Sequence, residues 1–236
     1  MIRNNATEDD LRYYFRSAFS ATCVIFGLKD NKLHVLLQRR DKEPYKNSFS
    51  LPACMLYPND VIEDRVDELI KSICGVEEFY RKQIRAFTDT TRHPLGRVIS
   101  IGFYCFVNAE HCVLNPNEDL VWSEYRNLPP LAFDHNEIAG AAHRRVLTKM
   151  SSQLAGFELI PKKFTLKELQ EMYEAVLGHS LDKRNFRRKV LRHHVIQETG
   201  EFQSPWLESG KAPMLYTLDR ETYDRNRSLG MVYEIF

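Results

Sequence analysis

The chain has 236 residues, of which 43% are hydrophobic, 11% aromatic and 28% charged, and its formal net charge is +1. This composition excludes a disordered, collagen-like or low-complexity chain. No apolar run is long enough to span a membrane, and the first twenty residues lack the apolar core of a signal peptide. The five cysteines have no CxxC spacing, which predicts reduced thiols and no cysteine metal site. We therefore expect a cytoplasmic protein with no membrane contact.

Strand and helix patterns alternate through the first 155 residues. Two β-rich runs flank four turn-forming residues, which predicts a hairpin. Apolar residues then recur at helical spacing, and Gly75 follows as a helix stop. A later run is almost continuously apolar, which is typical of a buried central strand. The predicted elements are strands over 22–28, 33–37 and 97–107, and helices over 60–74 and 132–150. Their order predicts a compact α/β domain over residues 1–155.

The second part of the chain, residues 156–236, has the order of a winged helix-turn-helix. Thr165 and Glu168 form a capping box that opens a helix, and Gly178 closes it. Asp182 is suited to cap a second helix. This helix is expected to run to about residue 193, and strands are expected over 195–199 and 214–218. Helix, short turn, helix and β-hairpin make a winged helix-turn-helix domain over residues 156–236.

The second helix of this domain is strongly basic. Residues 183–194 contain six Lys or Arg and no acid. A solvated helix face usually mixes both signs, so this face favours DNA binding over solvation alone. Guanidinium groups match guanine edges and phosphates, and Asn can pair with adenine. The predicted DNA contacts are Lys183, Arg184, Asn185, Arg187, Arg188 and Arg192 on the helix and Lys211 in the wing.

Residues 51–76 resemble a Nudix box, the motif that holds Mg²⁺ for attack of water on nucleoside diphosphates. Aligned on Gly75, the box has Leu69, Ser72 and Ile73 where it requires glutamates. These side chains are poor ligands for a hard cation. The sequence therefore predicts no catalytic residue, no metal site and no cofactor. Three acids, Asp60, Asp64 and Glu68, share a helix face, which favours an ordinary polar face over a displaced metal site.

Nearly the whole chain is similar to the Nudix-related transcriptional regulators of bacteria, the NrtR/AraR-like family. The resemblance rests on the eroded box, on residues 157–190, and on the order of segments 35–40, 92–100 and 132–138. It implies an α+β fold, with a Nudix-like α/β/α sandwich followed by a winged helix-turn-helix domain. It also implies a nucleoid-associated homodimer that binds palindromic operator DNA and responds to a small molecule. We expect a repressor, with activation as the alternative.

The resemblance further implies an effector pocket on the sheet of the first domain. Because the eroded box lacks ligands for a metal-chelated diphosphate, we expect the effector to be a pentose or sugar derivative rather than ADP-ribose. Aromatic and polar side chains suit such a ligand. The expected effector-binding residues are Arg39, Phe49, Asp89, Arg92, His93, Arg97, Asp134 and His135. Structural roles remain open for each of them, such as strand capping for Arg97 and helix capping for Asp134.

Two other classes of function stay under consideration. One is a Nudix hydrolase that acts on ADP-ribose-like nucleoside diphosphates and carries an accessory C-terminal domain. The missing carboxylates argue against it. The other is an interaction module that does not bind DNA. The basic helix, which contains no acidic residue, argues against this second class. In the regulator, residues 151–163 are expected to transmit the effector signal between the two domains. Gly156 and Pro161 suggest that this connection has a defined conformation and is not a flexible Gly/Ser linker.

Overall fold

The computed structural model describes residues 17–77, 79–107, 109, 112–153, 162–203 and 212–231. Contacts divide the chain into two compact units. The first comprises Met1–Phe26, Val35–Cys105 and Cys112–Ala142, and the second Gly27–His34, Phe106–His111 and His143–Phe236. The predicted domain boundary at residue 155 lies outside the described residues. Among the described helices, none combines the length and apolarity needed to cross a membrane.

The first unit is built on a seven-stranded sheet with the strand order β3-β2-β1-β6-β5, to which β4 adds through β1 and β7 through β2. Its central strands are buried almost continuously, because layers on both faces exclude water from their side chains. The strands are β1 (Ala18–Lys29), β2 (Lys32–Arg39), β3 (Phe49–Ser50), β4 (Ala53–Leu56), β5 (Tyr80–Phe87), β6 (Val98–Val107) and β7 (Leu120–Glu124). The predicted strands over 22–28, 33–37 and 97–107 are thus confirmed as parts of β1, β2 and β6.

The turn between β1 and β2 has the backbone that a tight hairpin requires. Asp30 and Asn31 have φ angles of 50° and 55°. Two consecutive left-handed residues match the right-handed twist of the flanking strands, and Asp and Asn tolerate this conformation better than most residues. The hairpin predicted from the turn-forming residues is confirmed.

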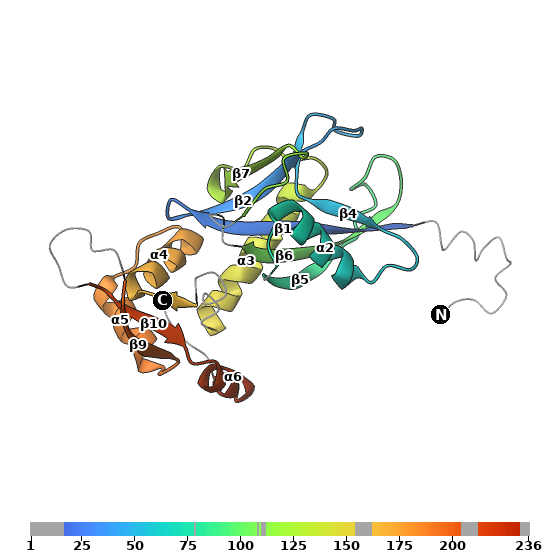
Figure 1. Cartoon of the computed structure of the whole chain (residues 1–236). Helices are drawn as coiled ribbons and strands as arrows, with labels where there is room; N and C mark the ends of the chain where they lie inside the picture. The colour runs from blue at the N-terminus through green and yellow to red at the C-terminus, as the bar shows by residue number, and fades with distance from the viewer. Residues whose placement is uncertain are drawn as a thin grey trace, which may run out of the picture. The chain divides into compact units, whose positions relative to one another are not determined.

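Two helices, α2 (Ile62–Cys74) and α3 (His135–Gln153), lie on opposite faces of the sheet (Figure 1). On the apolar side of α2, Val66, Ile70 and Ile73 are fully buried. Gly75 ends α2 in the left-handed conformation. The predicted second helix begins at residue 135 rather than 132, because Phe133 has a φ of 58° and cannot continue a right-handed helix. A short 3₁₀ helix, η1 (Tyr125–Asn127), follows β7.

The C-terminal part of the second unit has the predicted winged helix order. Its elements are β8 (Lys163–Phe164), α4 (Leu166–Leu177), α5 (Lys183–Arg192), β9 (Ile196–Phe202), β10 (Met214–Leu218) and α6 (Arg220–Ser228). The capping box of Thr165 and Glu168 is present, and Gly178 closes α4 with a φ of 73°. Strand β10 pairs antiparallel with both β8 and β9. Sequence reasoning missed β8 and α6.

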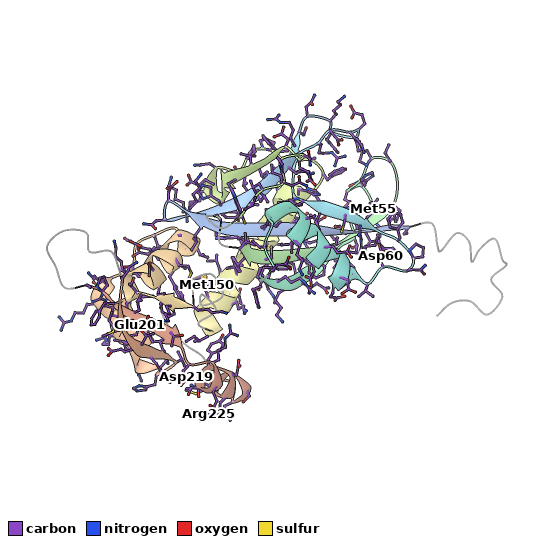
Figure 2. All side chains as sticks on the ribbon, in the orientation of Figure 1. Met55, Asp60, Met150, Glu201, Asp219 and Arg225 are labelled. Carbon is purple, nitrogen blue, oxygen red and sulfur yellow. The ribbon has the colours of Figure 1, made fainter. Side chains whose placement is uncertain are left out.

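Helix α6 begins because Asp219 accepts a hydrogen bond from the Thr222 backbone N–H at 3.0 Å. Figure 2 labels Asp219, which precedes this helix, and Arg225, which belongs to it. The side chain of Gln197 on β9 also donates to Asp219 at 2.7 Å. The same carboxylate therefore caps α6 and connects its start to strand β9.

Candidate functional site

Helix α5 presents its basic side chains to solvent because the opposite face is packed. Asp182 caps the helix by accepting a hydrogen bond from the Asn185 backbone N–H at 2.7 Å. Phe186 and Val190 are buried, and the Phe186 ring meets the edge of Tyr173 on α4 with the ring centres 5.5 Å apart. The predicted DNA contacts Lys183, Arg184, Arg187, Arg188 and Arg192 are exposed, and Asn185 is half-buried. Lys211 lies outside the described residues.

The charge of α5 is not neutralised within its own surface. In the described part of the chain, no carboxylate forms an ion pair with the basic side chains of α5. Arg188 instead donates to the Asn185 side-chain oxygen at 2.6 Å. Elsewhere on the same unit, Lys163 pairs with Glu201 at 2.7 Å. A positive helix face without counter-charges can bind phosphates and guanine edges.

The first unit holds a cavity of about 240 Å³, somewhat smaller than the roughly 300–1,000 Å³ of typical small-molecule sites. Strands β1 to β4 and the segments before β6 and α3 supply its walls. The lining residues are Ser20, Thr22, Gln38, Arg40, Ser50, Leu51, Ala53, Cys54, Met55, Arg92, His93, Val98, Phe133 and His135. This set contains two arginines and no carboxylate. The cavity is therefore suited to an anionic ligand.

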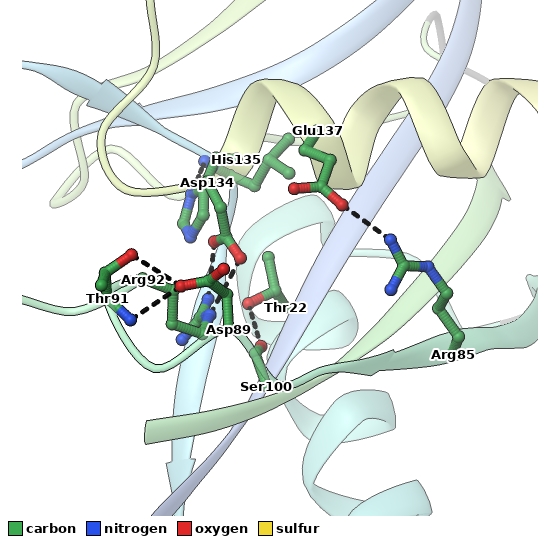
Figure 3. A network of polar contacts seen from close by, with 10 residues as sticks. Thr22, Arg85, Asp89, Thr91, Arg92, Ser100, Asp134, His135 and Glu137 are labelled. Carbon is green, nitrogen blue, oxygen red and sulfur yellow. Dashed lines mark hydrogen bonds and ion pairs between the residues drawn. The ribbon is translucent and has the colours of Figure 1, made fainter. Parts of the chain in front are cut away.

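Arg92 reaches the cavity from a buried position beside Asp134 (Figure 3). Its Nε lies 2.9 Å from Asp134 Oδ2, and its Nη2 lies 2.7 Å from Oδ1. Asp134 does not line the cavity but fixes the guanidinium that does. In the same view, the hydroxyls of Thr22 and Ser100 are hydrogen bonded at 2.7 Å between β1 and β6.

Two histidines in the wall are held in the neutral form. Burial lowers the pKa of His135 to about 3, and its Nδ1 accepts a hydrogen bond from the Leu51 N–H at 2.9 Å. The proton of the neutral ring is therefore assigned to Nε2. Burial also lowers the pKa of His93, with smaller contributions from Arg92 and Arg40. Neutral imidazoles can donate and accept hydrogen bonds without adding charge.

Phe133 organises the mouth of the cavity. Its ring stacks on His93 with centres 5.0 Å apart and planes 13° apart, and the Arg40 guanidinium lies 4.8 Å from its centre. Tyr45 meets it edge-on at 4.9 Å. Arg40 also donates from Nε to the Pro44 carbonyl at 2.8 Å. Phe133 has a φ of 58°, a left-handed backbone that is rare for a bulky residue. With this backbone, its ring contacts His93, Arg40 and Tyr45.

Of the eight effector residues expected from the sequence, the structure brings Arg92, His93 and His135 into the cavity wall, with Asp134 behind Arg92. The other four lie elsewhere. Arg39 pairs with Asp119 at 2.9 Å and covers the Phe49 ring at 4.4 Å. Asp89 accepts hydrogen bonds from the N–H and hydroxyl of Thr91 at 2.7 and 2.6 Å. Arg97 donates to the Thr88 carbonyl at 2.6 Å. None of these four lines the cavity.

Sequence reasoning missed Thr22, Gln38, Arg40 and Phe133 in the cavity wall. Alternation along β2 is the signal that could have found two of them. Side chains two residues apart share a face of a strand, so Gln38 and Arg40 point one way and Arg39 the other. Phe133 gave no such signal, because its position depends on the left-handed turn before α3.

The eroded box has no cluster of free carboxylates. Leu69 is half-buried and Ile73 is fully buried. The Ser72 hydroxyl donates to the Leu69 carbonyl at 2.9 Å. Three of its five acids meet arginines: Arg65 lies 2.6 Å from Glu68 and 3.5 Å from Asp60, and Arg81 pairs through two nitrogens with Asp67. Within the described ranges, no group of His, Cys, Asp and Glu is arranged to hold a metal ion.

Comparison with known proteins relates both units to one family. The sequence model of the NrtR DNA-binding winged helix domain matches residues 156–218. The ADPR responsive transcriptional repressor of Acinetobacter baylyi is 28% identical over 213 residues, covering 86% of this chain and 82% of that protein. The crystal structure of Shewanella oneidensis NrtR complexed with a 27mer DNA has a TM-score of 0.77 at 24% identity, covering 87% of this chain and 95% of that one.

The chain belongs to the NrtR family of Nudix-related transcriptional regulators. The α+β fold expected from the sequence, a Nudix-like sandwich followed by a winged helix, is confirmed. About half of the chain also matches the ADP-ribose pyrophosphatase of Methanocaldococcus jannaschii, at 32% identity over 130 residues, which is 54% of this chain and 73% of that protein.

These relatives do not support the expected sugar effector. The Acinetobacter repressor is named for its response to ADPR, and the Methanocaldococcus enzyme for ADP-ribose. The expectation of a pentose or sugar derivative assumed that diphosphate recognition needs the metal ligands of the box. The cavity wall contains two arginines and no acid, so an anionic ligand does not require a metal ion there.

Proposed function

We propose that this NrtR-family protein is a transcriptional repressor that binds palindromic operator DNA as a homodimer. Residues 1–155 would sense the effector, and residues 156–236 would bind DNA. The observation that carries the proposal is the basic face of α5, whose cations lack carboxylate partners in the described part of the chain. Two identical helices in successive major grooves require half-sites about 10 bp apart or a multiple of that spacing.

For the effector, we propose an ADP-ribose-type nucleotide bound in the cavity of the first unit. Arg40 has carbonyl and aromatic partners but forms no ion pair among the described residues. A diphosphate would supply the missing counter-charge, and guanidinium groups bind phosphate oxygens in pairs. A neutral pentose would leave this charge uncompensated. In this arrangement arginine takes the part that Mg²⁺ plays in an intact Nudix box.

A hydrolase is the second candidate, because one relative of the first domain is named as an ADP-ribose pyrophosphatase. The residues of this chain favour binding without hydrolysis. Ile73 is buried in the core, Ser72 bonds to its own helix, and Glu68 pairs with Arg65. None of these groups is placed to hold a metal that would activate water.

DNA binding is tested with the full chain and a pool of random duplexes. Bound duplexes are selected, sequenced and tested by fluorescence anisotropy at several salt concentrations. We expect a two-fold symmetric consensus and a dimer-to-duplex stoichiometry in sedimentation. Binding that is salt-dependent but shows no consensus after selection would overturn the operator proposal.

The effector is tested by adding ADP-ribose to the protein–operator complex. A ligand that prefers the DNA-free state lowers operator affinity by no more than its differential affinity for the two states. A weakening of ~5–150-fold is typical of such coupling. Ribose, arabinose and ribose 5-phosphate serve as parallel ligands. Release by a free pentose but not by ADP-ribose would overturn the nucleotide proposal, and tightening would identify an activator.

A further inference from the structure

Two cysteines of the first unit, distant in sequence, lie beside each other at the end of α2. Cys74 is the last residue of that helix, and Cys112 begins a segment that runs along the helix end. The Val113 N–H donates to the Cys74 carbonyl at 3.0 Å, and the Asn115 N–H donates to the Ile73 carbonyl at 3.0 Å. These backbone hydrogen bonds hold the segment against the helix.

Close approach of the two segments depends on Gly75. A Cβ atom at this position would lie 3.0 Å from the Val113 carbonyl oxygen and 3.3 Å from the Val113 Cβ. The residue also has a φ of 63°, which a side chain disfavours. Glycine thus allows residue 112 to reach the helix end.

The two thiols titrate together. A hydrogen bond from the Cys74 thiol lowers the pKa of Cys112, whereas the same bond and burial raise the pKa of Cys74. Cys112 is half-buried and Cys74 is buried. Cys112 is therefore the thiol of the pair that deprotonates more readily and that solvent reaches, whereas Cys74 is shielded from solvent.

The remaining cysteines do not share this arrangement. Cys23 and Cys105 are fully buried, and burial raises the pKa of each thiol. Cys54 is half-buried like Cys112, but burial raises its pKa. No metal-binding group of three or more ligands occurs among the residues that the structure describes. The pair is therefore better suited to redox chemistry than to metal binding.

We propose that Cys74 and Cys112 form a peroxide-sensitive dithiol that is modified to an intramolecular disulfide. The Cys112 thiolate attacks a peroxide oxygen, so an S–O bond forms, the O–O bond breaks, and the leaving hydroxide takes a proton to become water. Cys74 then attacks the Cys112 sulfur, forming the S–S bond. The S–O bond breaks, and the oxygen leaves as water with the Cys74 proton. Both thiols are oxidised, and hydrogen peroxide is reduced to two waters.

The backbone holds the two cysteines close together. The Val113 N–H binds the Cys74 carbonyl, so Cys112 directly precedes the residue that is hydrogen bonded to Cys74. A disulfide needs the two Cβ atoms about 3.5–4.5 Å apart. The bond would join the end of α2 to residues 112–115, on the helix that packs against strand β4 of the cavity wall.

The test treats the reduced full-length protein with hydrogen peroxide and measures its intact mass. We expect a loss of two hydrogen atoms, loss of two thiols that react with a maleimide, and a proteolytic fragment in which Cys74 is joined to Cys112. Dithiothreitol should restore the original mass. A gain of oxygen atoms at Cys112 without a cross-link, or a cross-link between two chains, would overturn the proposal.

Variants separate this pair from general thiol oxidation. Cys112→Ser should abolish the mass loss, because the first attack is removed. Cys54→Ser is the matched control, since Cys54 is also half-buried, and it should form the same cross-link as the parent protein. If Cys112→Ser still loses two hydrogens, a different pair reacts and the assignment is wrong. The peptide map of the parent protein tests the pairing even if a variant at buried Cys74 fails to fold.

Discussion

Arg92 and Asp134 form a doubly hydrogen-bonded ion pair in which the side chains are only 4% and 13% exposed. The pair connects the loop before β6 to the start of α3, and it fixes one of the two arginines that line the cavity. Arg85 and Glu137 provide an exposed counterpart nearby, with N–O separation of 2.7 Å and exposures of 52% and 57%. Both pairs join an arginine to a carboxylate, but one pair is buried and the other is exposed to solvent.

Asp134→Ala should lower the free energy of unfolding by about 3–5 kcal/mol, because it leaves the Arg92 charge buried without a partner. Glu137→Ala is the matched control and should cost only about 0–1 kcal/mol, since water solvates Arg85. Urea unfolding at neutral pH measures both. Equal small losses would show that the buried pair is not needed for stability.

His135 should make the fold sensitive to acid. Its folded-state pKa is about 3, whereas an unfolded histidine titrates near 6.5. Between these values the unfolded chain binds a proton that the folded chain does not, so stability falls as pH falls. The expected slope is about 1.4 kcal/mol per pH unit below pH ~6.

The acid sensitivity is measured by urea unfolding at steps from pH 7.5 to about pH 4.5, where carboxylates begin to contribute. His135→Gln, which keeps an acceptor for the Leu51 N–H, should flatten the profile over that window. His179→Gln changes an exposed histidine and is the control. A profile that stays unchanged in the first variant would contradict the assignment.

Arg40→Ala should weaken ADP-ribose binding by roughly 1.5–3 kcal/mol, the range for a hydrogen bond to a charged group. Arg39→Ala is the adjacent control, because Arg39 pairs with Asp119 and does not line the cavity. Calorimetric titration of the full chain compares the two affinities. Equal losses in both variants would mean that general charge, rather than this cavity, attracts the nucleotide.

Arg188→Ala should reduce operator affinity by about 1–3 kcal/mol and relax preference at one base position. The Asn185 contact holds this guanidinium at the exposed face of α5. Lys211→Ala, in the wing predicted from the sequence, should weaken all sequences similarly and flatten the salt dependence. Lys82→Ala, which removes an exposed cation of β5, is the control and should change neither property. If operator binding survives the first two changes unaltered, the DNA face has been misassigned.

Incubation with ADP-ribose and Mg²⁺ or Mn²⁺ should release product no faster than a sample without protein. The reason is that Leu69, Ser72 and Ile73 offer no carboxylate where the Nudix box needs metal ligands. Product is quantified by chromatography over the time in which an active pyrophosphatase consumes its substrate. Saturable, metal-dependent turnover would instead support the hydrolase.

Local sequence signals determined the elements of the winged helix. The capping box of Thr165 and Glu168, the stop at Gly178 and the cap at Asp182 act within a few residues, so the sequence predicts them before any packing is known. The absence of acids on α5 likewise predicted an exposed positive face. The eroded box could also be identified by its resemblance to the Nudix motif, because the positions of that motif lie on one helix and the loop before it.

Which residues line the cavity depends on the tertiary structure. Arg39 ends strand β2 and Arg40 follows it, so their side chains point to opposite faces, and of the two only Arg40 lines the cavity. Phe133 reaches the mouth through a left-handed backbone that surrounding contacts stabilise. Cys74 and Cys112 meet because a segment distant in sequence packs on the end of α2. Sequence determines such local features as caps, periodicity and charge, whereas contacts between distant segments depend on how the whole chain packs.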